Sequence, residues 1–152
     1  MADRSINDLP EGYVPLVELK DGYEPSDKDE YMCDEHIEYF RRRIMQWREE
    51  LMRESNETIE NLRSEARDIS DDAERASRET ENTFELRTRD RYRKLLKKIN
   101  KTLQRINDGD YGYCEETDEE IGLKRLMARP IATLCIDAQE RWELKQRVTQ
   151  EG

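Results

Sequence analysis

The clearest chemical pattern in the chain is formed by two cysteines in its C-terminal part. Each is followed, three positions later, by a residue other than cysteine. Cys114 is followed by Thr117, and Cys135 is followed by Ala138. Two C-x-x-C pairs in this arrangement are typical of structural zinc sites, because four thiolates close a tetrahedron around the ion. Threonine and alanine supply neither a thiolate nor an imidazole. The spacing therefore predicts the outline of a zinc finger without its metal, in which the two cysteines remain free thiols.

An acidic run near the middle of the chain has two compatible interpretations. Asp71 and Glu74 have the spacing of a capping box, and carboxylates are favoured at a helix N-terminus. The same carboxylates, with Asp72 beside them, could instead meet a metal ion or basic residues of another protein. One carboxylate can cap the helix while its neighbour points outward, so both interpretations remain open.

Basic residues follow this acidic run. Those between residues 87 and 105 are typical of an exposed helical face that pairs with acids of a neighbouring helix. The alternative is that they join Lys124, Arg125 and Arg129 to hold a polyphosphate ligand.

Composition excludes several classes of protein. The net charge of −10 argues against nonspecific binding to nucleic acid. A single histidine and no glycine-rich phosphate loop leave no catalytic arrangement, so we do not expect an enzyme. No apolar stretch has the length of a membrane span, and three widely spaced cysteines do not suggest a disulfide framework. A cytoplasmic protein with reduced thiols is expected.

Apolar residues at steps of three and four predict the elements that position these groups. One stripe begins at Ile37 and extends to Ile69, and charged residues such as Arg42 occupy the other faces. A second stripe extends from Tyr92 to Ile106, with sparser apolar residues before it. A chain with 34% hydrophobic and 42% charged residues suits long exposed helices better than one large core. The sparser apolar residues are Ala76, Phe84 and Leu86.

We therefore predict a mostly α fold with four parts. Residues 1–33 form an N-terminal arm that packs on the globular part, and residues 34–108 form a long antiparallel coiled-coil hairpin with its tip near 68–76. Residues 109–135 form a small module with the degenerate, metal-free finger, and residues 136–152 form a C-terminal helix. Trp142 and Leu144 of that helix are expected to face inward or towards the base of the hairpin. Such a hairpin predicts a monomer, whereas pairing between chains would instead make a coiled-coil scaffold.

Several short segments together form a recognisable pattern: residues 85–91, 93–95, 110–115, 120–126, 128–130 and 134–137. They resemble the DksA/TraR family of bacterial transcription factors, over roughly residues 30–150. The resemblance implies a factor that binds RNA polymerase directly and does not bind DNA. The hairpin would enter the secondary channel, with its acidic tip near the catalytic magnesium. Together with the alarmone ppGpp, such a factor regulates ribosomal RNA and amino-acid biosynthesis promoters in the stringent response.

The resemblance also implies roles for particular residues. The tip motif would comprise Asp71, Asp72, Glu74 and Ala76, and Glu74 stands where the family has a shorter Asp. Gln139 stands where a lysine is common, and family members with fewer cysteines resemble variants that work without zinc. No cofactor of its own is expected beyond ppGpp as co-regulator. The residues that resemble ppGpp contacts are Arg91, Leu95, Lys98, Arg125, Arg129 and Asp137.

Overall fold

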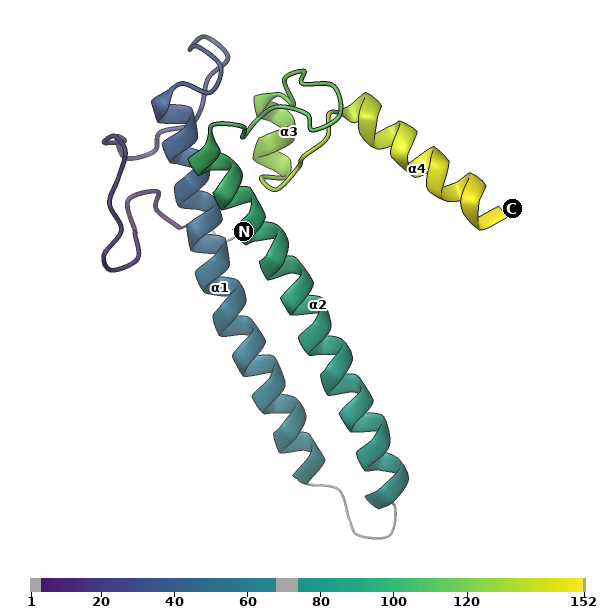
Figure 1. Cartoon of the computed structure of the whole chain (residues 1–152). Coiled ribbons are helices and arrows are strands. Elements are labelled where there is room, and N and C mark those ends of the chain that lie inside the picture. Colours follow the sequence, from purple (N-terminus) through teal and green to yellow (C-terminus); the bar gives the residue numbers. More distant parts are fainter. Residues whose placement is uncertain (1–3, 68–73, 152) are drawn as a thin grey trace.

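Two long helices that run side by side dominate the structure, a computed structural model that describes residues 4–67 and 74–151. Helix α1 (Asp34–Arg67) and helix α2 (Glu74–Asp108) are antiparallel and form a rod (Figure 1). At about 1.5 Å per residue, each helix is about 50 Å long. The two helices pack against each other along this rod.

Two smaller helices follow at the end of the rod where α1 begins. Helix α3 (Leu123–Ala128) packs beside the rod, whereas helix α4 (Ile136–Glu151) points away from it (Figure 1). The described residues contain no β-strand, only an isolated bridge between Tyr113 and Glu120. The predicted mostly helical fold, with a long antiparallel hairpin, a small globular module and a C-terminal helix, is confirmed.

The apolar seam between α1 and α2 is strong at the end nearest the finger. Phe40, Ile44 and Leu51 of α1 are buried there, as are Ile99 and Ile106 of α2. These residues follow the predicted steps of three and four, so they lie on the faces that meet. The seam therefore anchors the rod at one end.

Farther along the rod, the seam differs from the prediction. Phe84 and Leu86 are 59% and 67% exposed, so they do not belong to it. Thr88 is buried instead, and the hydroxyl oxygens of Tyr92 and Thr58 lie 3.3 Å apart across the two helices. The helical register that partly buries Tyr92 also turns Thr88 inward and Leu86 outward, because positions four apart share a face.

Helix α2 ends at a glycine, as the sequence predicts. Gly109 has a φ of 81°, in the left-handed region that favours glycine. The N–H of Asp110 donates to the carbonyl oxygen of Arg105 at 3.0 Å, which satisfies a carbonyl at the helix end. The chain then turns into the finger segment.

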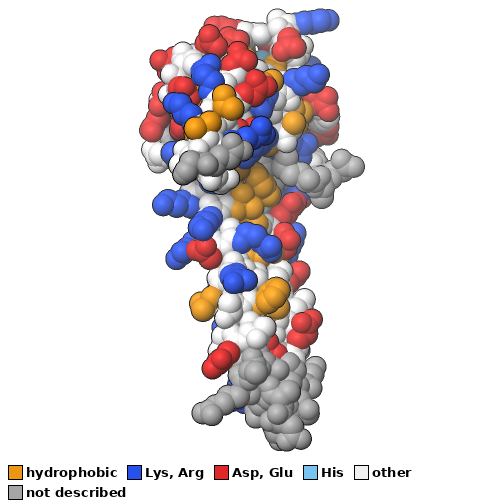
Figure 2. All heavy atoms as spheres, turned by 90° about the vertical axis from the view of Figure 1, so that its right-hand side faces the viewer, with side chains coloured by type: hydrophobic (Ala, Val, Ile, Leu, Met, Phe, Trp, Pro, Cys, Tyr) orange, Lys and Arg blue, Asp and Glu red, His pale blue; other side chains and the backbone are white. Residues whose placement is uncertain are grey.

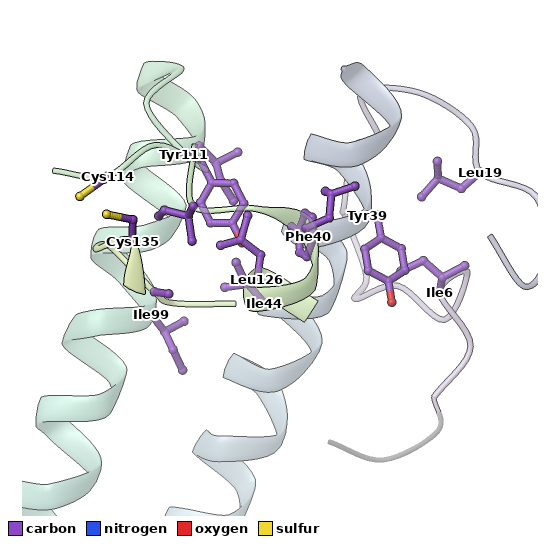
Figure 3. Close-up of a cluster of buried hydrophobic side chains, with 14 of the residues drawn as sticks. Ile6, Leu19, Tyr39, Phe40, Ile44, Ile99, Tyr111, Cys114, Leu126 and Cys135 are labelled. Carbon is purple, nitrogen blue, oxygen red and sulfur yellow. The ribbon is translucent and has the colours of Figure 1, made fainter. Parts of the chain in front are cut away.

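A compact core lies where the arm, the rod and the finger meet. Tyr111 and Leu126 from the finger segment pack there, together with Ile6 and Leu19 from the N-terminal arm (Figure 3). The hydroxyl of Tyr111 donates to the carbonyl oxygen of Pro130 at 2.7 Å. Segments far apart in the sequence therefore share one core, which we call the head and define as residues 4–50 and 99–138.

A row of buried polar side chains on α1 fastens the arm. Glu38, Arg42 and Gln46 are spaced by four and are almost completely buried. Glu38 accepts hydrogen bonds from the Tyr13 hydroxyl at 2.9 Å and the Leu16 N–H at 3.0 Å, and it forms an ion pair with Arg42. Arg42 therefore lies off the apolar seam, on a face of α1 that the arm covers.

The last helix differs from the prediction as well. Trp142 and Leu144 are 51% and 61% exposed, so they face neither the core nor the base of the hairpin. Among the described side chains of α4, Ala138 in the first turn is fully buried, and the exposed Arg141 lies 3.6 Å from Glu116 of the finger. No helix among the described residues is long and apolar enough to cross a membrane.

Candidate functional site

Helix α1 ends at Arg67 and helix α2 begins at Glu74, at the end of the rod farthest from the head (Figure 1). Asp71 and Asp72 fall outside the described residues, as do the side chains of Glu74 and Ala76. The tip assignment therefore remains a prediction.

A basic cavity lies between α2, α3 and the start of α4. It has a volume of about 210 Å³, and three of the six predicted ppGpp residues line it: Lys98, Arg125 and Arg129. Lys101 and Gln139 also line this cavity, which brings cations from separate elements towards one opening. Arg91, Leu95 and Asp137 do not line it.

One of these cations is held by neighbouring backbone. The guanidinium of Arg125 donates from Nε to the carbonyl oxygen of Leu134 at 3.0 Å. The side chains of Lys98 and Arg129 are exposed, on α2 and at the end of α3 respectively. Several cations around one opening suit an anion with more than one phosphate.

The remaining predicted residues occupy two other places. Arg91, Leu95 and Lys98 lie on one stripe of α2, at steps of four and three. The Arg91 guanidinium carbon lies 5.5 Å from the centre of the Tyr92 ring. Asp137 lies in the first turn of α4. Figure 2 shows Lys and Arg side chains on the half of the rod nearest the head, interspersed with acidic ones.

The finger joins α2 through one arginine. Arg105 donates to the carbonyl oxygens of Asp110 at 2.9 Å and Tyr113 at 2.7 Å. Its Nη1 lies 2.6 Å from an Oε1 atom of Glu115, and Nζ of Lys101 lies 3.7 Å from the same oxygen. Glu115 therefore links the finger to one face of α2. Lys101 on that face also lines the basic cavity.

Three of the four finger positions lie together, and two of these carry thiols. Cys114 and Cys135 are buried and free of disulfides, and their side chains lie close together in Figure 3. The Thr117 hydroxyl oxygen lies 3.8 Å from the Cys135 sulfur. The backbone N–H of Cys135 hydrogen-bonds to Cys114. Ala138, three residues after Cys135, is fully buried.

This residue set does not fit a structural zinc ion. A closed zinc site needs four ligands such as thiolates or imidazoles, and here the third and fourth positions are a hydroxyl and a methyl group. No cluster of three or more His, Cys, Asp or Glu side chains suitable for a metal ion occurs within residues 4–67 and 74–151. The finger is held by its core contacts and by the hydrogen bonds of Arg105.

The Cys114 thiol ionises more easily than an ordinary cysteine. Burial opposes its ionisation, but hydrogen bonds from the Thr117 hydroxyl and from the N–H groups of Cys135, Thr117 and Glu116 outweigh this effect. Together they lower the pKa of Cys114 to about 7. Cys33, at the start of α1, has the opposite environment, because burial raises the pKa of its thiol.

Two segments of the chain, one in the hairpin and one in the finger, match models of known protein families. Residues 36–106 match the family model described as "DnaK suppressor protein DksA, N-terminal domain". Residues 109–143 match the model described as "Prokaryotic dksA/traR C4-type zinc finger". The finger family is thus recognisable here although two of its four cysteines are replaced.

Whole proteins show the same likeness. The chain is 53% identical over 133 residues to "RNA polymerase-binding transcription factor DksA" of Caulobacter vibrioides. This match covers 88% of this chain and 93% of the relative. It is 43% identical over 125 residues to the Escherichia coli protein of the same description, covering 82% and 83% of the two chains. The solved structure of transcription factor DksA2 from Pseudomonas aeruginosa is 44% identical, with a TM-score of 0.69, over 77% of this chain and 90% of that one. The chain therefore belongs to the DksA/TraR family.

Proposed function

We propose that this protein is a transcription factor that binds bacterial RNA polymerase directly through the secondary channel. The observation that carries the proposal is the extent of its likeness to proteins described as RNA polymerase-binding transcription factors. That likeness spans the hairpin and the finger together, at 53% identity over 88% of the chain. The shape supports it, because a rod with a head at one end can reach into a channel while the head stays outside (Figure 1).

In this proposal the hairpin brings Asp71, Asp72, Glu74 and Ala76 towards the polymerase active site. The factor acts with ppGpp at the polymerase interface to regulate ribosomal RNA and amino-acid biosynthesis promoters in the stringent response. The basic cavity supports the ppGpp part, because Lys98, Arg125 and Arg129 line one opening. Arg91, Leu95 and Asp137 lie outside that cavity, so their part in the site would require contacts that the polymerase completes.

The proposal describes a binding protein and not an enzyme, one that works as a monomer in the cytoplasm without direct DNA contact. The finger works without zinc, since its four positions hold only two thiols. The alternative of a coiled-coil scaffold receives no specific support, because the seam near the head is already filled within one chain.

The direct test is binding to bacterial core RNA polymerase, followed by transcription in vitro from a ribosomal RNA promoter with and without ppGpp. We expect binding and a reduced transcript level, with a stronger reduction when ppGpp is present. Absence of polymerase binding would end the proposal.

Variants separate the ppGpp site from general docking. Lys98→Ala and Arg129→Ala should reduce the response to ppGpp more than the effect without it. Lys97→Ala is the matched control, because Lys97 is an exposed lysine of α2 that does not line the cavity. Equal losses with and without ppGpp in the two cavity variants would contradict the assignment.

A tip variant separates docking from action at the active site. Asp71→Asn should abolish promoter regulation and leave polymerase affinity nearly unchanged. Loss of affinity would show that the tip serves docking instead.

A further inference from the structure

The cysteine pair in the finger has been left without a role by the loss of the zinc ligands. Two cysteines from separate parts of the finger nevertheless lie close together (Figure 3), since the Cys135 N–H bonds to Cys114 and the Thr117 hydroxyl lies next to both residues. The exposed fractions of Cys114 and Cys135 are 1% and 8%. A pair of thiols held together in this way is a preformed set of two soft ligands.

We propose that Cys114 and Cys135 bind a soft monovalent metal ion, Cu⁺, as a two-coordinate thiolate site. Soft thiolate ligands select Cu⁺, which is satisfied by two of them, whereas Zn²⁺ in a structural site takes four. The missing third and fourth ligands that exclude zinc therefore do not exclude Cu⁺. Ala138 fills the fourth position with a buried methyl group, which favours a low coordination number.

The surroundings suit the charge of such a complex. Binding converts two thiols and one Cu⁺ into a bis-thiolate complex with one net negative charge, and two protons are released. Hydrogen bonds from N–H groups and from the Thr117 hydroxyl already point at the Cys114 sulfur, where they stabilise that charge. The cation Arg105 lines the same cavity as Cys114, although Glu115 and Asp118 also line it.

An entry path to the site is present. The cavity beside Cys114 has a volume of about 490 Å³ and also borders Gly109 and Tyr113. An ion delivered by a small chelator can therefore reach the residue Cys114 through this cavity. Once bound, it would link the finger loop to the residue that precedes α4.

The experiment uses the full chain, reduced and oxygen-free, with Cu⁺ supplied from its coloured bicinchoninate complex, whose absorbance falls as the protein takes up the ion. We expect one Cu⁺ per chain. Cys114→Ser and Cys135→Ser should each remove this binding, and Cys33→Ser should retain it as the matched cysteine control. One Cu⁺ per two chains, or retained binding in either finger variant, would overturn the proposal.

A measurement on the unaltered protein covers the case in which a finger variant fails to fold. The X-ray absorption spectrum of the Cu⁺-loaded chain should show two sulfur neighbours and the edge feature of a linear two-coordinate ion. A third sulfur, or nitrogen and oxygen neighbours, would refute the site. In a parallel titration, Zn²⁺ held by a competing chelator should not be taken up, and equal uptake of both metals would also refute it.

Discussion

Glu38 shows how a single buried charge can organise a segment that has no regular structure. Its carboxylate is completely buried on α1 and accepts hydrogen bonds from Tyr13 and Leu16 of the arm. Arg42 supplies the opposite charge and also donates to the carbonyl oxygen of Val17 at 3.0 Å. A buried ion pair is tolerated only when its remaining hydrogen-bonding groups are satisfied, and the arm provides the partners here.

Removing the charge of Glu38 should therefore be costly. Glu38→Gln leaves Arg42 buried without an anion, so we expect a loss of about 3–5 kcal/mol in the free energy of unfolding. Denaturant unfolding measures it. Glu49→Gln is the control, because Glu49 pairs with Arg4 at 3.3 Å and its side chain is 47% exposed. That control should cost less than about 1 kcal/mol. Similar losses of unfolding free energy in both variants would show that the buried ion pair contributes no more to stability than the exposed one.

The thiol of Cys114 predicts a pH dependence of stability. Its pKa falls from the ordinary 9.0 to about 7 on folding, so the folded state favours the thiolate. The resulting stabilisation is fully present above the ordinary pKa and is lost as pH falls through the folded value. The unfolding free energy of the wild type, relative to Cys114→Ser, should therefore rise between pH 7 and pH 9 when chelator is present.

Cys33 offers a control of opposite sign. Because burial raises the pKa of its thiol, the wild type should gain no stability relative to Cys33→Ser over the same pH range. A rise of equal size for both cysteines would mean that the environment of Cys114 is not responsible.

The four helices are stabilised by different means. Helices α1 and α2 share a seam, and Ile44 and Ile99 on its two sides are fully buried. Helix α4 has no comparable partner among the described residues: Trp142, Leu144 and Val148 are all more than half exposed. An isolated helix of this length is marginal in water, so α4 depends on its anchored first turn.

This contrast predicts very different costs for apolar substitutions. Ile99→Ala should lower the free energy of unfolding by about 2–5 kcal/mol, because it leaves a cavity in the core. Trp142→Ala and Leu144→Ala remove exposed side chains and should change it by less than about 0.5 kcal/mol. Thermal unfolding followed by circular dichroism compares the three variants. A large loss for Trp142→Ala would show that α4 packs against the head in solution.

The molecule as a whole separates a well-packed head from a thinly packed rod. The head combines the arm, the ends of both long helices and the finger, whereas polar residues such as Thr88 and Glu85 occupy the seam farther out. Arg63 and Glu85 form an ion pair across the rod at 3.2 Å, on a partly exposed surface where such pairs add little. Stability is therefore concentrated at one end, and the length of the rod provides reach.

An intramolecular hairpin predicts a monomer. The faces that a coiled coil would offer to another chain are already used between α1 and α2, and a net charge of −10 opposes self-association. Sedimentation equilibrium at micromolar concentration should give a mass near 18.3 kDa at low and at physiological salt. Twice that mass would favour the scaffold alternative.

The sequence alone determined the features that depend on neighbouring positions along the chain. Apolar steps of three and four located the packed seam from Phe40 to Leu51, and Gly109 marked the end of α2. The replacement of cysteine by Thr117 and Ala138 predicted a finger without a complete ligand set. These signals are local, because helix periodicity, caps and ligand spacing all act within a few residues.

Only the tertiary structure decided which faces are covered. Glu38 and Arg42 have the spacing of an ordinary exposed ion pair, and nothing local indicates that the arm buries them. Trp142 is apolar but has no element packed beside it within the described part of the chain, so its exposure could not be read from its own helix. The basic cavity likewise needs α2, α3 and α4 to meet before Lys98 and Arg129 share one opening. Burial and convergence depend on segments distant in the sequence, and no short pattern of residues encodes them.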